Sequence, residues 1–171
     1  FFVGSAGSIQ RTTTLPSGCP WQTGVQMTVT TSGDADLTFQ GVTGAESTSG
    51  ITVSSSTTYT YSIWLYIPSG STISSLTLRP IEWTSSGTIA KDNTLTVFTT
   101  QGVWQRIKAT WTTQSTTAKV TLRVRALGTG VFYATACMLE QKPYATSFID
   151  GTRTAETLTI PTAGVLNPQE G

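Results

Sequence analysis

Apolar side chains occupy alternate positions along most of this chain, and this alternation limits what it can fold into. The clearest case lies between residues 59 and 67, where every odd-numbered position carries a large apolar side chain. Successive side chains of a β-strand point to opposite faces, so such a run buries one face only. Clusters of Gly, Pro and Ser separate the runs at intervals of about 8 to 12 residues, as in a sandwich or barrel. The sequence therefore predicts an all-β fold.

The spacing of these runs indicates the architecture. The expected strands cover 25–29, 37–39, 51–53, 57–67, 76–83, 95–99, 104–112, 119–126 and 131–139. About eight to ten strands suit an antiparallel β-sandwich of the jelly-roll type, whose paired sheets limit exposed edges. An immunoglobulin-like sandwich is the alternative, although such domains usually hold about 100 residues.

The chain divides into one large unit and a short tail. Residues 1–150 are predicted to form the sandwich. In 151–171, Pro and Gly interrupt a brief alternation at Leu158 and Ile160, so we expect a linker and the start of a following domain. The sequence does not begin with Met, and we interpret it as a piece of a longer protein, with other domains of that chain and further copies of it (a homo-oligomer) as candidate partners.

Charge and residue content exclude several functions. The formal net charge is +1, which gives no global positive field for nucleic acid. No run approaches the length needed to cross a bilayer. Histidine is absent, so Ser-His-Asp, Cys-His and His-metal sites cannot form. Cys19 and Cys137 match no redox or zinc motif, and Cys137 is expected to be a free, buried thiol, with a disulfide to Cys19 as the alternative.

Four short segments carry a resemblance to a known family. They are 59–64 (YTYSIW), 104–107 (WQRI), 138–140 (MLE) and 144–149 (YATSFI). In this order they resemble the jelly-roll carbohydrate-binding modules attached to xylanases and glucanases, most closely the versions in phage tail or minor structural proteins. The tail resembles the entry of a concanavalin- or laminin-G-like domain. The resemblance implies an extracellular or virion-associated protein that binds a polysaccharide or bacterial surface glycan.

The same resemblance bears on metal binding. Family members often carry an Asp four residues before the Leu of the Leu-Glu pair, where it helps to hold a structural calcium. Here this position is Thr135. A hydroxyl does not replace a carboxylate as a ligand for a hard cation, so no metal and no other cofactor is expected.

Strand 57–67 supplies the first candidate site residues. Its odd positions are the predicted core, which leaves Trp64 and Tyr66 on the opposite face of the sheet. In the resembled family this is the concave face that grips a glycan, because flat C–H patches of sugars pack on aromatic rings. The alternative is that a covering loop, 18–24, buries Trp64, since Trp is usually largely buried.

A basic group is predicted beside this aromatic pair. The phase of strand 119–126 points Arg123 and Arg125 outward, and Arg79 faces outward from its own strand. Guanidinium groups pair bidentately with carboxylate or phosphate on a sugar. The alternative for each is a solvated basic surface. Trp83, at a strand end, is expected either to line the rim of the site or to plug the end of the sandwich.

Other residues receive structural roles. Trp104 belongs to a structural element of the family, while Tyr133, Thr135, Cys137 and Leu139 share one strand phase and are expected in the core.

No catalytic pair is evident, although a glycosidase needs two facing carboxylates. The acidic candidates are Asp34, Asp36, Glu46, Glu82, Asp92 and Asp150. The sequence therefore favours a non-catalytic carbohydrate-binding module. The competing interpretation is a structural spacer or assembly domain of a virion fibre that has no ligand.

Overall fold

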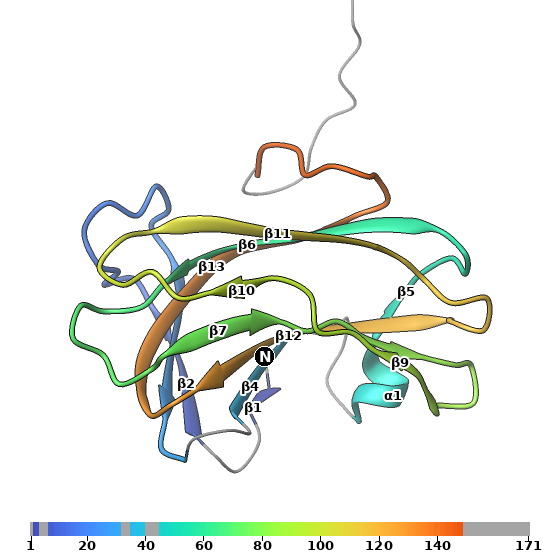
Figure 1. Cartoon of the computed structure of the whole chain (residues 1–171), viewed down its shortest axis with the longest axis horizontal. Helices are drawn as coiled ribbons and strands as arrows, with labels where there is room; N and C mark the ends of the chain where they lie inside the picture. Colours follow the sequence, from blue (N-terminus) through green and yellow to red (C-terminus); the bar gives the residue numbers. More distant parts are fainter. Residues whose placement is uncertain (1, 4–6, 32–34, 40–44, 149–171) are drawn as a thin grey trace, which may run out of the picture.

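The fold is an antiparallel β-sandwich, as the sequence predicts. A computed structural model describes residues 2–3, 7–31, 35–39 and 45–148. Two sheets pack face to face around one core, and all strand pairs between the named strands are antiparallel (Figure 1). Within the described part, no helix has the length and apolar character that a membrane crossing requires.

The five-stranded sheet forms one layer. Its strands, in spatial order, are β11 (Gln105–Thr112), β6 (Thr58–Tyr66), β13 (Gly130–Glu140), β3 (Gly24–Val29) and β2 (Gly7–Thr12). β6 and β13 are the longest strands of this sheet. β6 lies between β11 and β13, so both of its edges are hydrogen-bonded.

The eight-stranded sheet forms the other layer, with β12 at its centre. Its main path is β1 (Phe2–Val3), β4 (Ala35–Phe39), β12 (Lys119–Leu127), β7 (Ser75–Leu78) and β10 (Val97–Phe98). The remaining strands are β5 (Ile51–Thr52) and β8 (Ile81–Trp83), which also pair with β12, and β9 (Ile89–Asp92), which pairs with β8. One helical turn, α1 (Glu46–Ser49), precedes β5.

The core lies between the sheets and follows the predicted alternation. On β6, the odd positions from Tyr59 to Leu65 are buried, as is Ile67 just after the strand. On β12, the buried side chains are Val120, Leu122, Val124 and Ala126. Each fully buried aliphatic side chain contributes about 1.5–3 kcal/mol relative to exposure, so this alternation fixes which face of each strand turns inward.

Most expected strands are confirmed, and one is divided. The expected strand 76–83 is broken into β7 and β8 around Pro80, which has no N–H to donate to a ladder. β2 and β9 were not predicted, because their short sequences lack a strong apolar alternation. Residues 151–171, expected as a linker, lie outside the described residues.

A β-bulge in β13 changes the phase of that strand. Thr135 pairs with Trp64 and Met138 with Ser62, so Ala136 and Cys137 together face a single residue of β6. Ala136 has φ 51°, a left-handed conformation that is unusual for alanine. The expectation that Tyr133 and Thr135 share the core face with Cys137 is therefore wrong.

Cys137 lies against the core as a free thiol, and Cys19 is also free. Part of the surface of Cys137 borders a cavity of about 350 Å³ that Leu122 and Phe148 also line. Burial raises the pKa of the Cys137 thiol to about 12, so the group is protonated at neutral pH.

We expect Ala136→Gly to leave the protein as stable as the wild type or slightly more so. Glycine adopts positive φ without strain, which offsets the extra entropy, of about 0.4–1 kcal/mol, that it gives the unfolded chain. The matched control is Ala134→Gly on the same strand, where the native residue is fully buried. This control should lose about 1 kcal/mol or more in urea unfolding, because no strain is relieved. A larger loss at 136 than at 134 would contradict this account of the bulge.

The buried thiol predicts a pH dependence of stability. Its pKa is higher in the folded state (about 12) than in the unfolded chain, so its contribution is fully present below the unfolded value. As the pH rises from about 8.5 toward 12, the unfolded state alone loses the proton, and stability falls by about 1.4 kcal/mol per pH unit. Urea midpoints at pH 8 and 10.5 should therefore fall more for the wild type than for Cys137→Ala; equal falls would refute the assignment.

Candidate functional site

Three aromatic rings lie in a row on the outer face of the five-stranded sheet. Tyr133 pairs with Tyr66, and Trp104, one residue before β11, is level with Tyr66 on its other side. The ring centroids of Tyr66 and Trp104 are 5.4 Å apart, and those of Tyr66 and Tyr133 are 6.2 Å apart. We call these three residues the aromatic row.

The row continues across the sheet with amide side chains. Tyr133 pairs with Gln26 of β3, and Gln26 pairs with Gln10 of β2. Rings and amides at matching positions on neighbouring strands therefore form one line that runs across the strands.

A second line lies directly beside the first. Trp64 is flanked by Arg106 on β11 and by Thr135 on β13. Trp64 and Tyr66 are both half-buried, so the prediction that β6 turns them away from the core is confirmed, and neither is completely covered.

Two segments hold the borders of this face. The indole Nε1 of Trp104 donates to the carbonyl of Pro16, 3.0 Å away, in the connection between β2 and β3. At the other end, the hydroxyl of Thr60 donates to the carbonyl of Lys142 at 2.7 Å. The segment after β13, orange to red in Figure 1, therefore lies over the far end of β6.

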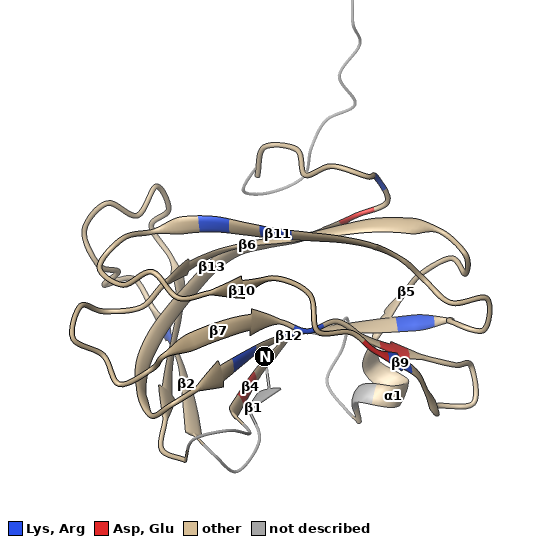
Figure 2. Ribbon diagram, viewed as in Figure 1, with Lys and Arg blue, Asp and Glu red and all other residues tan. Residues whose placement is uncertain are grey.

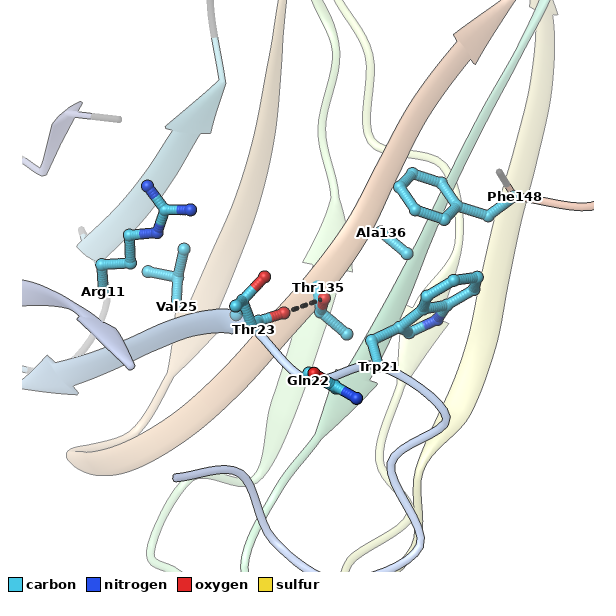
Figure 3. Close-up of a pocket in the computed structure, with 9 residues that line it drawn as sticks. Arg11, Trp21, Gln22, Thr23, Val25, Thr135, Ala136 and Phe148 are labelled. Carbon is cyan, nitrogen blue, oxygen red and sulfur yellow. Dashed lines mark hydrogen bonds between the residues drawn. The ribbon is translucent and has the colours of Figure 1, made fainter. Parts of the chain in front are cut away.

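A cavity of about 300 Å³ adjoins Thr135 at the end of β3 (Figure 3). Trp21 and Phe148 contact each other edge to face, with centroids 4.6 Å apart, and form one wall. Arg11 lies on the opposite side of the Thr23–Thr135 contact. The cavity is an additional recess beside the outer face of the five-stranded sheet, which we call the aromatic face.

Thr135 stands at the expected calcium position, and its hydroxyl is already used. It donates to the carbonyl oxygen of Thr23 at 2.7 Å, which joins β13 to the residue just before β3 (Figure 3). Among the described residues, no three carboxylate or thiol side chains gather in a way that could hold a metal. That the protein binds no metal stays a prediction.

The three predicted arginines lie on the other sheet. Arg123 and Arg125 of β12 point away from the core on the outer face of the eight-stranded sheet, and Arg79 joins them there. The prediction that they lie beside Trp64 is wrong, because the two groups occupy opposite outer faces of the sandwich. Figure 2 shows basic positions on both sheets.

These arginines surround one carboxylate. Asp36 accepts from Arg125 Nε at 2.9 Å and from Arg123 Nη1 at 3.1 Å, while Arg79 Nη1 lies 3.7 Å away. Arg79 also forms a two-pronged pair with Asp92. The cluster ties β4, β12 and the segment after β7 together, which gives the arginines a structural role.

Trp83 also lies on the eight-stranded sheet. It pairs with Lys119, and its indole Nε1 donates to the hydroxyl of Thr121 at 3.1 Å. It therefore covers the outer face of β12 near α1, far from the aromatic row. The expected rim position beside Trp64 is not observed.

The described acidic candidates for catalysis are each engaged in structural contacts. Asp36 and Asp92 bind the arginines. Glu82 is fully buried and accepts from Asn93 Nδ2 and from the backbone N–H of Gln114, both at 2.8 Å. Asp34, Asp150 and the side chain of Glu46 lie outside the described residues.

Comparison with known sequences assigns the family. A family model described as "Carbohydrate binding domain" matches residues 16–128, which is more than half of the chain. The chain belongs to this carbohydrate-binding family. No curated protein sequence matches the chain.

Solved structures with the same fold include carbohydrate-binding modules of xylanases. One is the CBM22-1–GH10 portion of endo-1,4-β-D-xylanase 10B from Clostridium thermocellum, complexed with xylohexaose (TM-score 0.65, 14% identity, 85% of this chain and 26% of that chain). Another is the CBM22-1 xylan-binding domain of Xyn10C from Paenibacillus barcinonensis (TM-score 0.64, 10% identity, 84% and 86%). This carbohydrate-binding module thus spans about a quarter of the first structure and most of the second.

A phage protein shows the fold more distantly. The enzymatically active domain of tailspike protein 4 from bacteriophage CBA120 has a TM-score of 0.54 and 8% identity, over 81% of this chain and 18% of that chain. At these identities the likeness concerns the fold alone.

Sequence reasoning found half of the aromatic face of the module. It identified Trp64 and Tyr66, but it gave Trp104 a structural role and placed Tyr133 in the core. The position of Trp104, two residues before the outward-facing Arg106, was a usable signal. Tyr133 offered no such signal, because the bulge after it was not visible in the sequence.

Replacing Asp36 should destabilise the module without disturbing the aromatic row. In Asp36→Asn, three guanidinium groups lose their shared carboxylate, and we expect a loss of about 1–3 kcal/mol in urea unfolding. The matched control is Asp92→Asn, whose carboxylate is more exposed (36% against 12%) and has Arg79 as its one ion-pair partner among the described residues. It should lose no more than about 1 kcal/mol. Equal losses would show that the cluster around Asp36 is not a structural centre.

Proposed function

We propose that this domain is a non-catalytic carbohydrate-binding module that binds a polysaccharide on the outer face of its five-stranded sheet. The observation that carries the proposal is the aromatic row with Trp64 beside it. Sugar rings present flat C–H patches that pack on aromatic faces, and Tyr and Trp also keep a polar group for hydrogen bonding. The side-chain amides of Gln26 and Gln10 extend the row with groups that can bind hydroxyls.

The line of the row supports an extended ligand. Neighbouring strands are about 4.8 Å apart, so the row and its amides cross the sheet over roughly 19 Å. A polysaccharide chain laid along this line would meet rings first and amides afterwards. The fold likeness to xylan-binding domains makes xylan the first ligand to test.

Wider context is part of the proposal. A module of this kind acts outside the cell, attached to other domains of its chain. A place in a phage tail or virion protein, with a bacterial surface glycan as ligand, is supported by the tailspike fold likeness. The alternative, a spacer without a ligand, requires that no glycan bind the half-buried Trp64 and Tyr66.

The contacts and the location of the carboxylates support the proposal that the module is non-catalytic. Each described candidate is bound by arginine or amide donors on the eight-stranded sheet or its end, away from the aromatic face. Hydrolysis of a bound glycan would need two carboxylates that face it.

Truncating Trp64 should weaken polysaccharide binding by about tenfold or more, which is the usual cost of removing a central aromatic contact. The measurement is isothermal titration calorimetry of Trp64→Ala with soluble xylan and mixed-linkage glucan. The matched control is Trp83→Ala, which removes a half-buried indole from the opposite sheet. Its affinity should equal that of the wild type.

Both variants need a thermal unfolding curve to show that they fold. If Trp64→Ala binds as well as the wild type while Trp83→Ala does not, the site lies on the eight-stranded sheet. If the wild type binds no plant or bacterial glycan at millimolar concentrations, the spacer interpretation is correct.

A further inference from the structure

We infer that the polysaccharide carries carboxylate groups, as in a uronic acid, and that Arg106 binds them. The inference rests on the proposed function, because it concerns the ligand of the same face. It starts from one difference between the two sheets, namely how their arginines are paired.

Arg106 occupies a fixed position on the aromatic face. It pairs with Trp64 across β11 and β6, and it is half-buried. Its Nη2 donates to the hydroxyl of Ser62 at 2.9 Å and lies 3.8 Å from the sulfur of Met138 on β13. The guanidinium therefore extends over β6 toward β13 and lies within the face.

No carboxylate balances this charge among the residues that the structure describes. Its Nε is buried without a hydrogen-bond partner, and its Nη1 makes no hydrogen bond to the described residues. On the same face, Glu140 is occupied by the backbone N–H and hydroxyl of Thr146. In contrast, Arg79, Arg123 and Arg125 each have Asp36 as a partner on the opposite sheet.

The surroundings of Arg106 favour an anion. Lys108 follows on the same face of β11 and is exposed. Figure 2 shows basic positions along β11. Burial weakens the hydration of a charge, so a half-buried guanidinium gains more from a carboxylate than an exposed one does. A neutral glycan would leave this charge without a partner, whereas a uronic acid stacked near Trp64 would supply one.

The test compares one polysaccharide with its own neutral form. Glucuronoxylan and the same xylan after chemical reduction of its carboxyl groups share the backbone and differ in charge. We expect the wild type to bind the acidic form at least about tenfold more tightly, since hydrogen bonds between charged groups are stronger than neutral ones. The preference should shrink as salt is raised.

Variants separate a local contact from a general charge effect. Arg106→Met keeps an unbranched side chain, removes the charged guanidinium group and should bind both forms with similar affinity. The control, Lys108→Met, removes the same charge two residues away on the same face and should keep most of the preference. If both variants lose it equally, long-range attraction is responsible and Arg106 is not the binding residue.

The remaining outcomes distinguish this inference from the proposed function. A wild type that binds both forms equally, with Trp64→Ala binding neither, overturns the inference and leaves the module intact. A wild type that binds neither xylan but does bind another neutral glycan also overturns it. If Arg106→Met does not fold, the carboxyl reduction and the salt series with the wild type still decide the question.

Discussion

The burial of one face of β6 against the eight-stranded sheet determines the rest of this structure. Tyr61, Ile63 and Leu65 are fully buried, and β6 is hydrogen-bonded along both edges. Moving the strand by one residue would place these side chains outside and Trp64 in the core, at a cost of several kcal/mol. The core that β6 forms therefore fixes the phase of its other side, where Trp64 and Tyr66 lie.

For regular strands, the alternation of apolar residues in the sequence was sufficient to predict which face is buried. The alternation on β6 and β12 predicted their buried faces and also that Trp64 and Tyr66 turn outward. The alternation failed on β13, because the extra residue at Ala136 exchanges the two faces between Tyr133 and Cys137. Alanine there carries no turn signal of the kind that glycine would give, so nothing in the local sequence marks the bulge.

The placement of the charged groups depended on strand pairing, which a single sequence does not show. Each of Arg79, Arg123 and Arg106 faces outward from its strand, and in the sequence they look alike. Only the pairing of β12 with β4 brings Asp36 opposite Arg125, and only the pairing of β11 with β6 brings Arg106 opposite Trp64. The fold class was thus predictable from alternation, while the composition of each outer face was not.

The hydrogen bond from Trp104 to Pro16 couples the connection between β2 and β3 to the aromatic row. The orientation of one ring in the row is set by a backbone carbonyl in a connection that belongs to neither of the strands next to that ring. Evolution can therefore change the geometry of this face by lengthening or shortening the connection, with no substitution in the sheet. Modules with the same strands but a different connection at this point would then differ in the orientation of this ring.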